Sequence, residues 1–222
     1  MRFPRHRILR VLKPKCRVSI SGALHRMLRF GEFAIAPNDF LRDTVAMPDY
    51  RRAWYPGGTY FFTVNLLQRQ GNDLLTRHID LLRAVVASVR QRHPFKIHGW
   101  VVLPEHLHCI IELPSEDADY ATRWRLIKMG FSKGLPHTER LSMVRIGRGE
   151  RGIWQRRYWE HLIRDERDYR THMDYVHINP VKHGLVKCVV DWPYSTFHRL
   201  VEEGVYPANW AGGNDGELGY DD

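Results

Sequence analysis

The alternating stretch at residues 103–113, LPEHLHCIIEL, constrains the fold of this chain more than any other segment. Successive side chains of a β-strand point to opposite faces, so every second residue shares a face. One face holds only apolar side chains, from Leu107, Cys109, Ile111 and Leu113. The other face holds two imidazoles and then two further residues, in the order His106, His108, Ile110 and Glu112. We therefore expect a strand whose apolar face lines the core and whose other face carries paired histidines.

Two neutral imidazoles that stand two residues apart on one face are a ready pair of metal ligands. A His-x-His pair is also short and common, and the spacing alone favours ordinary polar residues on a half-buried strand. The preceding residues, 95–102, also alternate as a strand. A three-residue loop, 103–105, would keep the apolar residues of both strands on one face. It pairs Val102 with His106, Trp100 with His108 and Lys96 with Glu112, so it predicts that Trp100 walls the histidine site.

Strand and helix patterns alternate along the rest of the chain. The sequence predicts a strand over 58–66, helices over 73–93, 118–133, 165–178 and 194–201, a basic loop over 134–152 and a strand within 153–163. Prolines end two of these helices, at Pro94 and at Asn179-Pro180. The order β-α-β-β-α-β-α predicts an α+β fold, a single antiparallel sheet with helices packed on it in the ferredoxin-like split βαβ manner.

Charge divides the chain into three parts. The net charge is +9, which favours a polyanionic partner, nucleic acid before a membrane surface, although a merely soluble basic protein would look the same. Residues 1–31 hold nine Lys and Arg and no acid, whereas residues 202–222 hold six acids and no base. We expect 1–46 to be an extension outside the fold, either a transit peptide, a nucleic-acid-binding arm or sequence read from a misplaced start. We expect 47–201 to be one domain and 202–222 to be a disordered acidic tail.

Localisation follows from what the sequence lacks. No apolar run reaches the roughly 18 residues that a membrane helix needs. The basic N-terminal residues lack the apolar segment of a secretory signal. The three cysteines are odd in number and far apart, which favours a reducing compartment over a disulfide framework. We expect a cytoplasmic protein.

The helix expected over 165–178 carries a second candidate site. Tyr169, Met173 and Val176 share its core stripe at 100° per residue, and a separate stripe holds Asp168, His172, Tyr175 and Asn179. Tyr175 and Asn179 stand one turn apart on the same side. A phenol one turn from an amide oxygen can be a nucleophile beside a metal ligand, although surface tyrosines on helices are frequent. His172 is the candidate general base, or else a satisfied surface histidine.

Several motifs resemble those of the REP-associated tyrosine transposases, within the single-tyrosine HUH (His-hydrophobe-His) transposases. They are WVVLPEHLHCI at 100–110, DYVHINPVKHG at 174–184, YRR at 50–52, IWQRRYWEH at 153–161 and DWPYSTFH at 191–198. They occur in matching order over about residues 47–210. Residues 1–46 have no counterpart, and the basic loop at 136–152 is longer than usual.

The resemblance implies an HUH endonuclease fold with His106, His108 and Asn179 as metal ligands and Tyr175 as the nucleophile. It implies cleavage and rejoining of single-stranded DNA, at REP-type hairpins, through a 5′-phosphotyrosine. It also implies Mg²⁺ or Mn²⁺, whereas two imidazoles alone suggest zinc or manganese. Two alternatives stay open, a non-catalytic hairpin-binding regulator and a nuclease that uses water. We expect a monomer or homodimer. The candidate DNA contacts are Arg51, Arg52, Arg123, Arg125, Arg156 and Arg157, with Trp154 or Trp159 stacking on a base.

Overall fold

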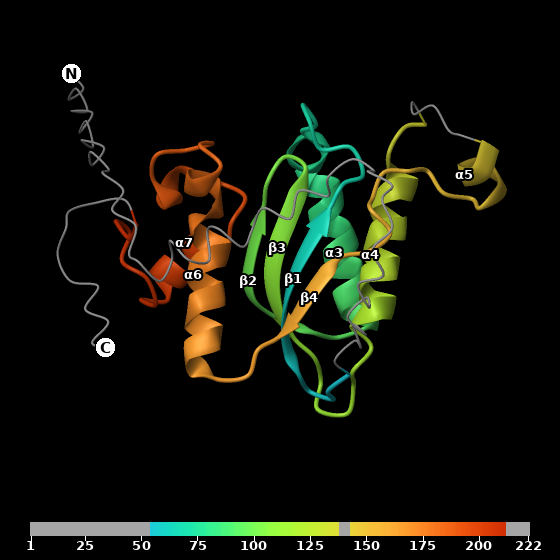
Figure 1. Cartoon of the computed structure of the whole chain (residues 1–222). Helices are drawn as coiled ribbons and strands as arrows, with labels where there is room; N and C mark the ends of the chain where they lie inside the picture. Colours follow the sequence, from blue (N-terminus) through green and yellow to red (C-terminus); the bar gives the residue numbers. More distant parts are fainter. Residues whose placement is uncertain (1–53, 138–142, 212–222) are drawn as a thin grey trace, which may run out of the picture.

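The computed structural model describes residues 54–137 and 143–211, which form one four-stranded antiparallel sheet with helices on both faces (Figure 1). The strands are β1 (Thr59–Asn65), β2 (Lys96–Val102), β3 (His106–Glu112) and β4 (Trp159–Leu162). The helices are α2 (Leu74–Arg77), α3 (Ile79–Arg92), α4 (Tyr120–Gly134), α5 (Met143–Gly147), α6 (Glu166–Lys182) and α7 (Phe197–Glu202), with a 3₁₀ turn, η1, at Val189–Asp191. The α+β fold predicted from the sequence is confirmed.

The strand order β2-β3-β1-β4 is that of two interleaved split βαβ units. β1 and β2 run parallel on either side of β3, and α3 connects them. β3 and β4 run parallel on either side of β1, and α4 connects them. The histidine strand β3 is therefore central in the sheet, and its backbone is hydrogen-bonded on both sides.

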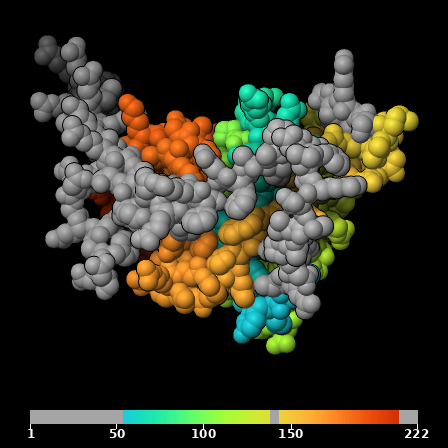
Figure 2. Space-filling view, viewed as in Figure 1, coloured from blue at the N-terminus to red at the C-terminus, as the bar shows by residue number. Residues whose placement is uncertain are grey.

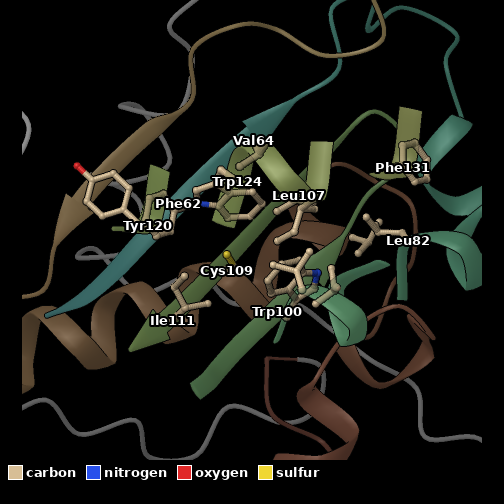
Figure 3. Close-up of a cluster of buried hydrophobic side chains, with 14 of the residues drawn as sticks. Phe62, Val64, Leu82, Trp100, Leu107, Cys109, Ile111, Tyr120, Trp124 and Phe131 are labelled. Carbon is tan, nitrogen blue, oxygen red and sulfur yellow. The ribbon is translucent and has the colours of Figure 1, made fainter. Parts of the chain in front are cut away.

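The larger core lies between the sheet and the pair α3 and α4. Alternate residues of β1 and β3 point into it, including Phe62, Val64, Leu107 and Cys109. From α4, Trp124, Ile127 and Phe131 meet them at helical spacing. Figure 3 shows these aromatic and aliphatic side chains interlocked against one side of the sheet.

A second core fills the opposite face, where α6 packs across β2 and β3. Phe61, Val101 and Ile110 of the sheet meet Met173 and Val176 of α6, and all five are buried. Both faces of β3 are therefore covered, and the histidine face is an interior face. In Figure 1, α6 stands on the other side of the sheet from α3 and α4.

The expected hairpin register was wrong over most of its length. Val101 pairs with His108 and Trp100 with Cys109, because the backbone N–H of Leu103 bonds the carbonyl of His106 across a two-residue connection. Trp100 therefore lies in the α3–α4 core with Cys109 (Figure 3), whereas His108 packs on Phe61 on the opposite face. A register shift between Ile97 and Gly99 then restores the expected pairing of Lys96 with Glu112. The prediction failed because it assumed that only one face of the hairpin was apolar.

Three boundaries also differ from those expected. The helix expected over 73–93 is broken at His78 into α2 and α3. Helix α6 continues through Pro180 to Lys182. Ile178, Asn179 and Pro180 are all buried, and we attribute the continuation to this packing, which offsets the hydrogen bond that proline cannot donate. The fold also extends past residue 201, since Trp210 is buried against Phe197.

Some expectations concern residues that lie outside the described part of the chain, and one concerns the basic loop. Residues 1–46, Arg51, Arg52 and most of the acidic tail lie outside the described residues. The expected basic loop contains α5, which sits at the outer margin of the molecule (yellow in Figure 2). Within 54–137 and 143–211, no helix is long and apolar enough to cross a membrane.

Gly99 sets how closely α6 approaches the sheet. A Cβ atom added to Gly99 would lie 2.8 Å from the sulfur of Met173 and 3.6 Å from Val176. We expect Gly99→Val to lower the free energy of unfolding by about 1–3 kcal/mol, because the added methyl groups overpack this contact. Gly147→Val, where nothing lies within 4 Å, should change it by less than about 0.5 kcal/mol. Urea denaturation measures both, and equal costs would contradict the expectation.

Candidate active site

The two histidines of β3 lie next to each other in the interior between the sheet and α6. Their ring centroids are 4.8 Å apart, and the exposed fractions of His106 and His108 are 2% and 3%. Nδ1 of His106 lies 3.0 Å from a carboxylate oxygen of Glu105. Nδ1 of His108 lies 2.8 Å from the hydroxyl of Thr63, its cross-strand neighbour on β1. Each ring is thus held through Nδ1, which leaves Nε2 as the nitrogen available for a ligand.

Asn179 on α6 supplies an oxygen to the same region. Its side-chain N–H donates to the backbone carbonyl of Tyr175, which fixes the amide along the helix. Asn179 is fully buried, and its Oδ1 makes no hydrogen bond within the described part of the chain. A buried acceptor without a partner costs free energy, so its retention calls for a binding role or another explanation.

Tyr175 lies one turn before Asn179 and contacts the histidine strand directly. Its ring centroid is 5.2 Å from that of His108 and 5.8 Å from that of Phe61, both edge to face. The ammonium of Lys182 lies 5.2 Å from the same ring. Helix α6 and strand β3 therefore meet at Tyr175, and we group Tyr175, Asn179, His106 and His108 as one candidate cluster.

The donor set fits a divalent metal ion. Nε2 of His108 is buried and has no hydrogen-bond partner among residues 54–137 and 143–211, as is true of Oδ1 of Asn179. Two imidazole nitrogens and an amide oxygen suit a first-row divalent ion. The carboxylate of Glu105 behind His106 is the outer-shell arrangement that orients metal-binding histidines.

Burial and neighbouring charges shift the pKa of three groups around the site. Burial, helped by the charges of His106 and His183, holds the pKa of His108 well below its usual value. Burial and the charge of His106 also lower the pKa of His183 to about 4. The pKa of Glu105 falls to about 2, because the hydrogen bond and charge of His106 outweigh the effect of burial. At neutral pH, His108 and His183 are therefore uncharged and Glu105 is a carboxylate.

Tyr175 itself is not activated by the protein alone. Burial raises its pKa above that of an ordinary phenol, against smaller opposing effects from the Asn179 side chain and the charge of Arg69. A phenol in this state is a weak nucleophile at neutral pH. Any nucleophilic role for Tyr175 thus requires an additional positive charge in the site.

A second group of possible ligands lies where β4 leads into α6. One ligand atom from each of His161, Asp168 and His172 lies within 4.8 Å of the others, so the group can hold a metal ion. The present contacts are those of hydrogen bonds, with Nε2 of His161 at 2.8 Å from Asp168 and Nδ1 of His172 at 3.0 Å. The two rings are stacked 4.5 Å apart and only 16° from parallel. We assign this group to anchoring α6, because Asp168 already hydrogen-bonds His161 and lies against His172.

His172 is therefore neither a surface histidine nor a free base. It is 6% exposed, and its Nδ1 lies 2.8 Å from the carbonyl oxygen of Asp168. Its ring packs 4.9 Å from that of Phe61, and its Nδ1 and ring face are both occupied by these contacts. We do not retain it as the general base.

The candidate DNA contacts divide by exposure. Arg123 is 2% exposed, and its guanidinium donates to Asp117 and to the carbonyls of Pro94 and Asp119, so it is a structural residue. Trp154 is half-buried on Phe131, and its indole N–H donates to the carbonyl of Lys128. The residues that remain accessible are Arg125, Arg156, Arg157 and Trp159.

Three residues that lie next to the site were not predicted from the sequence. Glu105 directly precedes the His-x-His pair, and Thr63 is placed by strand pairing alone. His183 lies 5.0 Å from the ring of His106, where the last turn of α6 ends. His183 stands two helical turns after Tyr175, so this spacing could have identified it as a neighbour of the site, because the helix continues through Pro180.

Comparison with known proteins places these features in a family. The chain is 51% identical to the REP-associated tyrosine transposase of Escherichia coli (strain K12) over 166 residues, 75% of this chain and 92% of that protein. It is 43% identical to a Haemophilus influenzae relative of the same family name, over 76% of this chain and 96% of the relative. No protein-family model matches.

A solved structure shares the fold as well. It is described as a REP-associated tyrosine transposase bound to a REP hairpin. It superposes on this chain with a TM-score of 0.64 at 48% identity and covers 78% of this chain and 96% of its own.

Proposed function

Because the chain belongs to the REP-associated tyrosine transposases, we propose that it is a metal-dependent DNA strand transferase in which Tyr175 is the nucleophile. One observation carries this proposal. Among the described residues, Nε2 of His108 and Oδ1 of Asn179 are two of the buried polar atoms without a hydrogen-bond partner, and both residues belong to the cluster that Tyr175 completes. A metal ion bound beside the nucleophile would give both atoms a partner.

The substrate we propose is single-stranded DNA at the foot of a REP-type hairpin. The solved relative is described as bound to a REP hairpin, and the net charge of this chain, +9, suits a polyanion. A duplex holds its backbone phosphates in a fixed geometry, whereas an unpaired strand can bend into a site beside a buried helix, so we propose an unpaired strand as the substrate. Arg125, Arg156 and Arg157 are accessible for phosphate contacts.

We propose a separate role for each residue of the site in the cleavage reaction. His106, His108 and Asn179 would hold Mg²⁺ or Mn²⁺, and the bound ion would polarise the scissile phosphate and orient it in line. The oxygen of Tyr175 attacks phosphorus, and a new O–P bond forms as the bond to the 3′ oxygen breaks. The phenol gives up its proton and the departing 3′ oxygen takes one, so the products are a 5′-phosphotyrosine and a free 3′-hydroxyl. The phosphodiester energy is conserved, and strands can be rejoined by the reverse attack.

The function is tested by incubating the protein with a labelled single-stranded hairpin oligonucleotide and Mn²⁺ or Mg²⁺. A covalent protein–DNA adduct on a denaturing gel supports the transferase. Binding without cleavage would instead indicate a regulatory hairpin-binding protein. Cleavage to a free 5′-phosphate without an adduct would indicate a nuclease that uses water.

Glu105 should tune metal affinity without touching the metal. Its carboxylate holds Nδ1 of His106 and also accepts from Arg69 at 3.3 Å. We expect Glu105→Ala to weaken Mn²⁺ binding by about 10- to 100-fold, as loss of an outer-shell carboxylate does. Glu105→Gln, which keeps a hydrogen-bond acceptor, should lose less Mn²⁺ affinity. Calorimetric titration of Mn²⁺ without DNA measures both, and an unchanged affinity in Glu105→Ala would remove Glu105 from the site.

A further inference from the structure

An exposed tryptophan stands on the same face of the sheet as the proposed active site. Trp159 opens the edge strand β4 and is 49% exposed. The neighbouring Tyr158 packs against the α3–α4 core, so Trp159 and His161 point to the opposite face, toward α6. The segment that leads from β4 into α6 reaches the viewed surface in Figure 2 (orange).

The Trp159 ring is fixed by other rings. It stacks on His161 with the planes 6° from parallel and the centroids 5.8 Å apart, and it meets Phe61 edge to face at 5.5 Å. His161 in turn stacks on His172 and forms a hydrogen bond with Asp168. A large ring that is already ordered, yet half open to solvent, loses little conformational entropy when a flat ligand stacks on it.

Strand pairing places Trp159 in line with the metal-binding cluster. Thr63 of β1 pairs with Trp159 on one side and with His108 on the other. The three residues form one row across the sheet, so Trp159 and His108 are two strand spacings apart, about 10 Å between backbones. Phe61 contacts the rings of Trp159, His108 and Tyr175, which makes the surface continuous.

We propose that Trp159 is a stacking platform for one base of single-stranded DNA, next to the phosphate that Tyr175 attacks. The proposal rests on the proposed function and adds to it the position of the unpaired strand. Exposed basic residues precede and follow Trp159 in the sequence, since Arg157 is exposed and the side chain of Arg164 is 72% exposed. An aromatic face between cationic groups is how proteins hold a single strand without reading its sequence.

The platform is tested by fluorescence anisotropy of a labelled REP hairpin with single-stranded flanks, in EDTA so that no cleavage occurs. We expect Trp159→Ala to weaken binding by about 5- to 150-fold, the range for loss of one stacked base. Trp159→Phe should keep most of the affinity. The matched control is Trp54→Ala, since Trp54 is 53% exposed but stacks on Tyr120 beside the other face, and it should bind as the wild type does.

A set of oligonucleotides with one abasic position each in the single-stranded flank identifies the base that stacks on Trp159. One abasic position in the flank should weaken binding to the wild-type protein and have no further effect on Trp159→Ala. Trp159→Ala that binds like the wild type, or a loss equal to that of Trp54→Ala, would overturn the platform. Failure of the platform and failure of the reaction are separable. A Trp159-dependent affinity without any adduct in Mn²⁺ would remove the reaction alone, and an adduct without a Trp159 effect would remove the platform alone.

Discussion

Replacing Tyr175 with phenylalanine is expected to abolish the covalent protein–DNA adduct while leaving hairpin binding within about twofold of the wild type. The substitution removes only the attacking oxygen. The Tyr175 ring, which packs on Phe61 and His108, stays in place. Because no other phenol belongs to this cluster in the described residues, we expect the cleavage rate to fall on the order of 10⁴-fold or more, as for loss of a principal catalytic group.

The matched control for this experiment is Tyr169→Phe on the same helix. The Tyr169 hydroxyl lies 3.0 Å from Nδ1 of His98, on the part of α6 that packs near β2. We expect Tyr169→Phe to form the adduct at the wild-type rate, measured by denaturing gel over time with saturating Mn²⁺. Full cleavage by Tyr175→Phe would show that water or another residue attacks the phosphate, and it would contradict the proposal.

Removing one imidazole of the proposed metal site should have the second large effect. We expect His108→Ala to weaken Mn²⁺ binding by at least about 100-fold, more than outer-shell changes cost, because it deletes a ligand. Adduct formation should be lost at Mn²⁺ concentrations that saturate the wild type. EDTA should have the same consequence in the wild-type protein, reversed by added Mn²⁺.

His161→Ala distinguishes the two groups of possible ligands. If the ion is held by His106, His108 and Asn179, then His161→Ala should bind Mn²⁺ with the wild-type affinity, measured by calorimetry without DNA. Its effect should appear in DNA binding, because His161 supports the ring of Trp159. Loss of Mn²⁺ binding in His161→Ala with retention in His108→Ala would instead assign the metal to His161, Asp168 and His172.

The elements of this fold could be predicted from sequence because their local patterns are strong. The two-residue alternation around Cys109 and Ile111 indicated β3, and apolar residues at helical spacing indicated α3 and α4. The order of elements then sufficed for an antiparallel α+β sheet.

The register and the covered faces could not be predicted in the same way. The loop length was chosen on the assumption that the His106 face was polar, yet α6 buries it with Met173 and Val176. Only tertiary packing reveals that a second apolar layer exists. The register shift between Ile97 and Gly99 could not be predicted either. Four residues of β2 pair differently from the prediction, and the shift then brings Lys96 opposite Glu112 as predicted.

The sequence predicted candidate ligands and a candidate nucleophile, but not the residues that surround them. His106, His108, Tyr175 and Asn179 belong to two separate motifs, and the structure brings them together. The partners that hold them come from strand pairing or from a helix that continues past a proline, as for Thr63 and His183. The exposure of Trp159, and the burial of Arg123, depend on packing that sequence spacing does not specify.

The most direct test of the central claim is to identify the residue that carries the DNA. The wild-type protein is incubated with a REP hairpin oligonucleotide and Mn²⁺, digested with protease and nuclease, and analysed by tandem mass spectrometry. We predict a nucleotide 5′-phosphate linked to Tyr175 in the peptide from α6, absent when EDTA is added. A linkage at any other residue, or cleaved DNA with no linked peptide, would contradict the assignment of Tyr175 as the nucleophile.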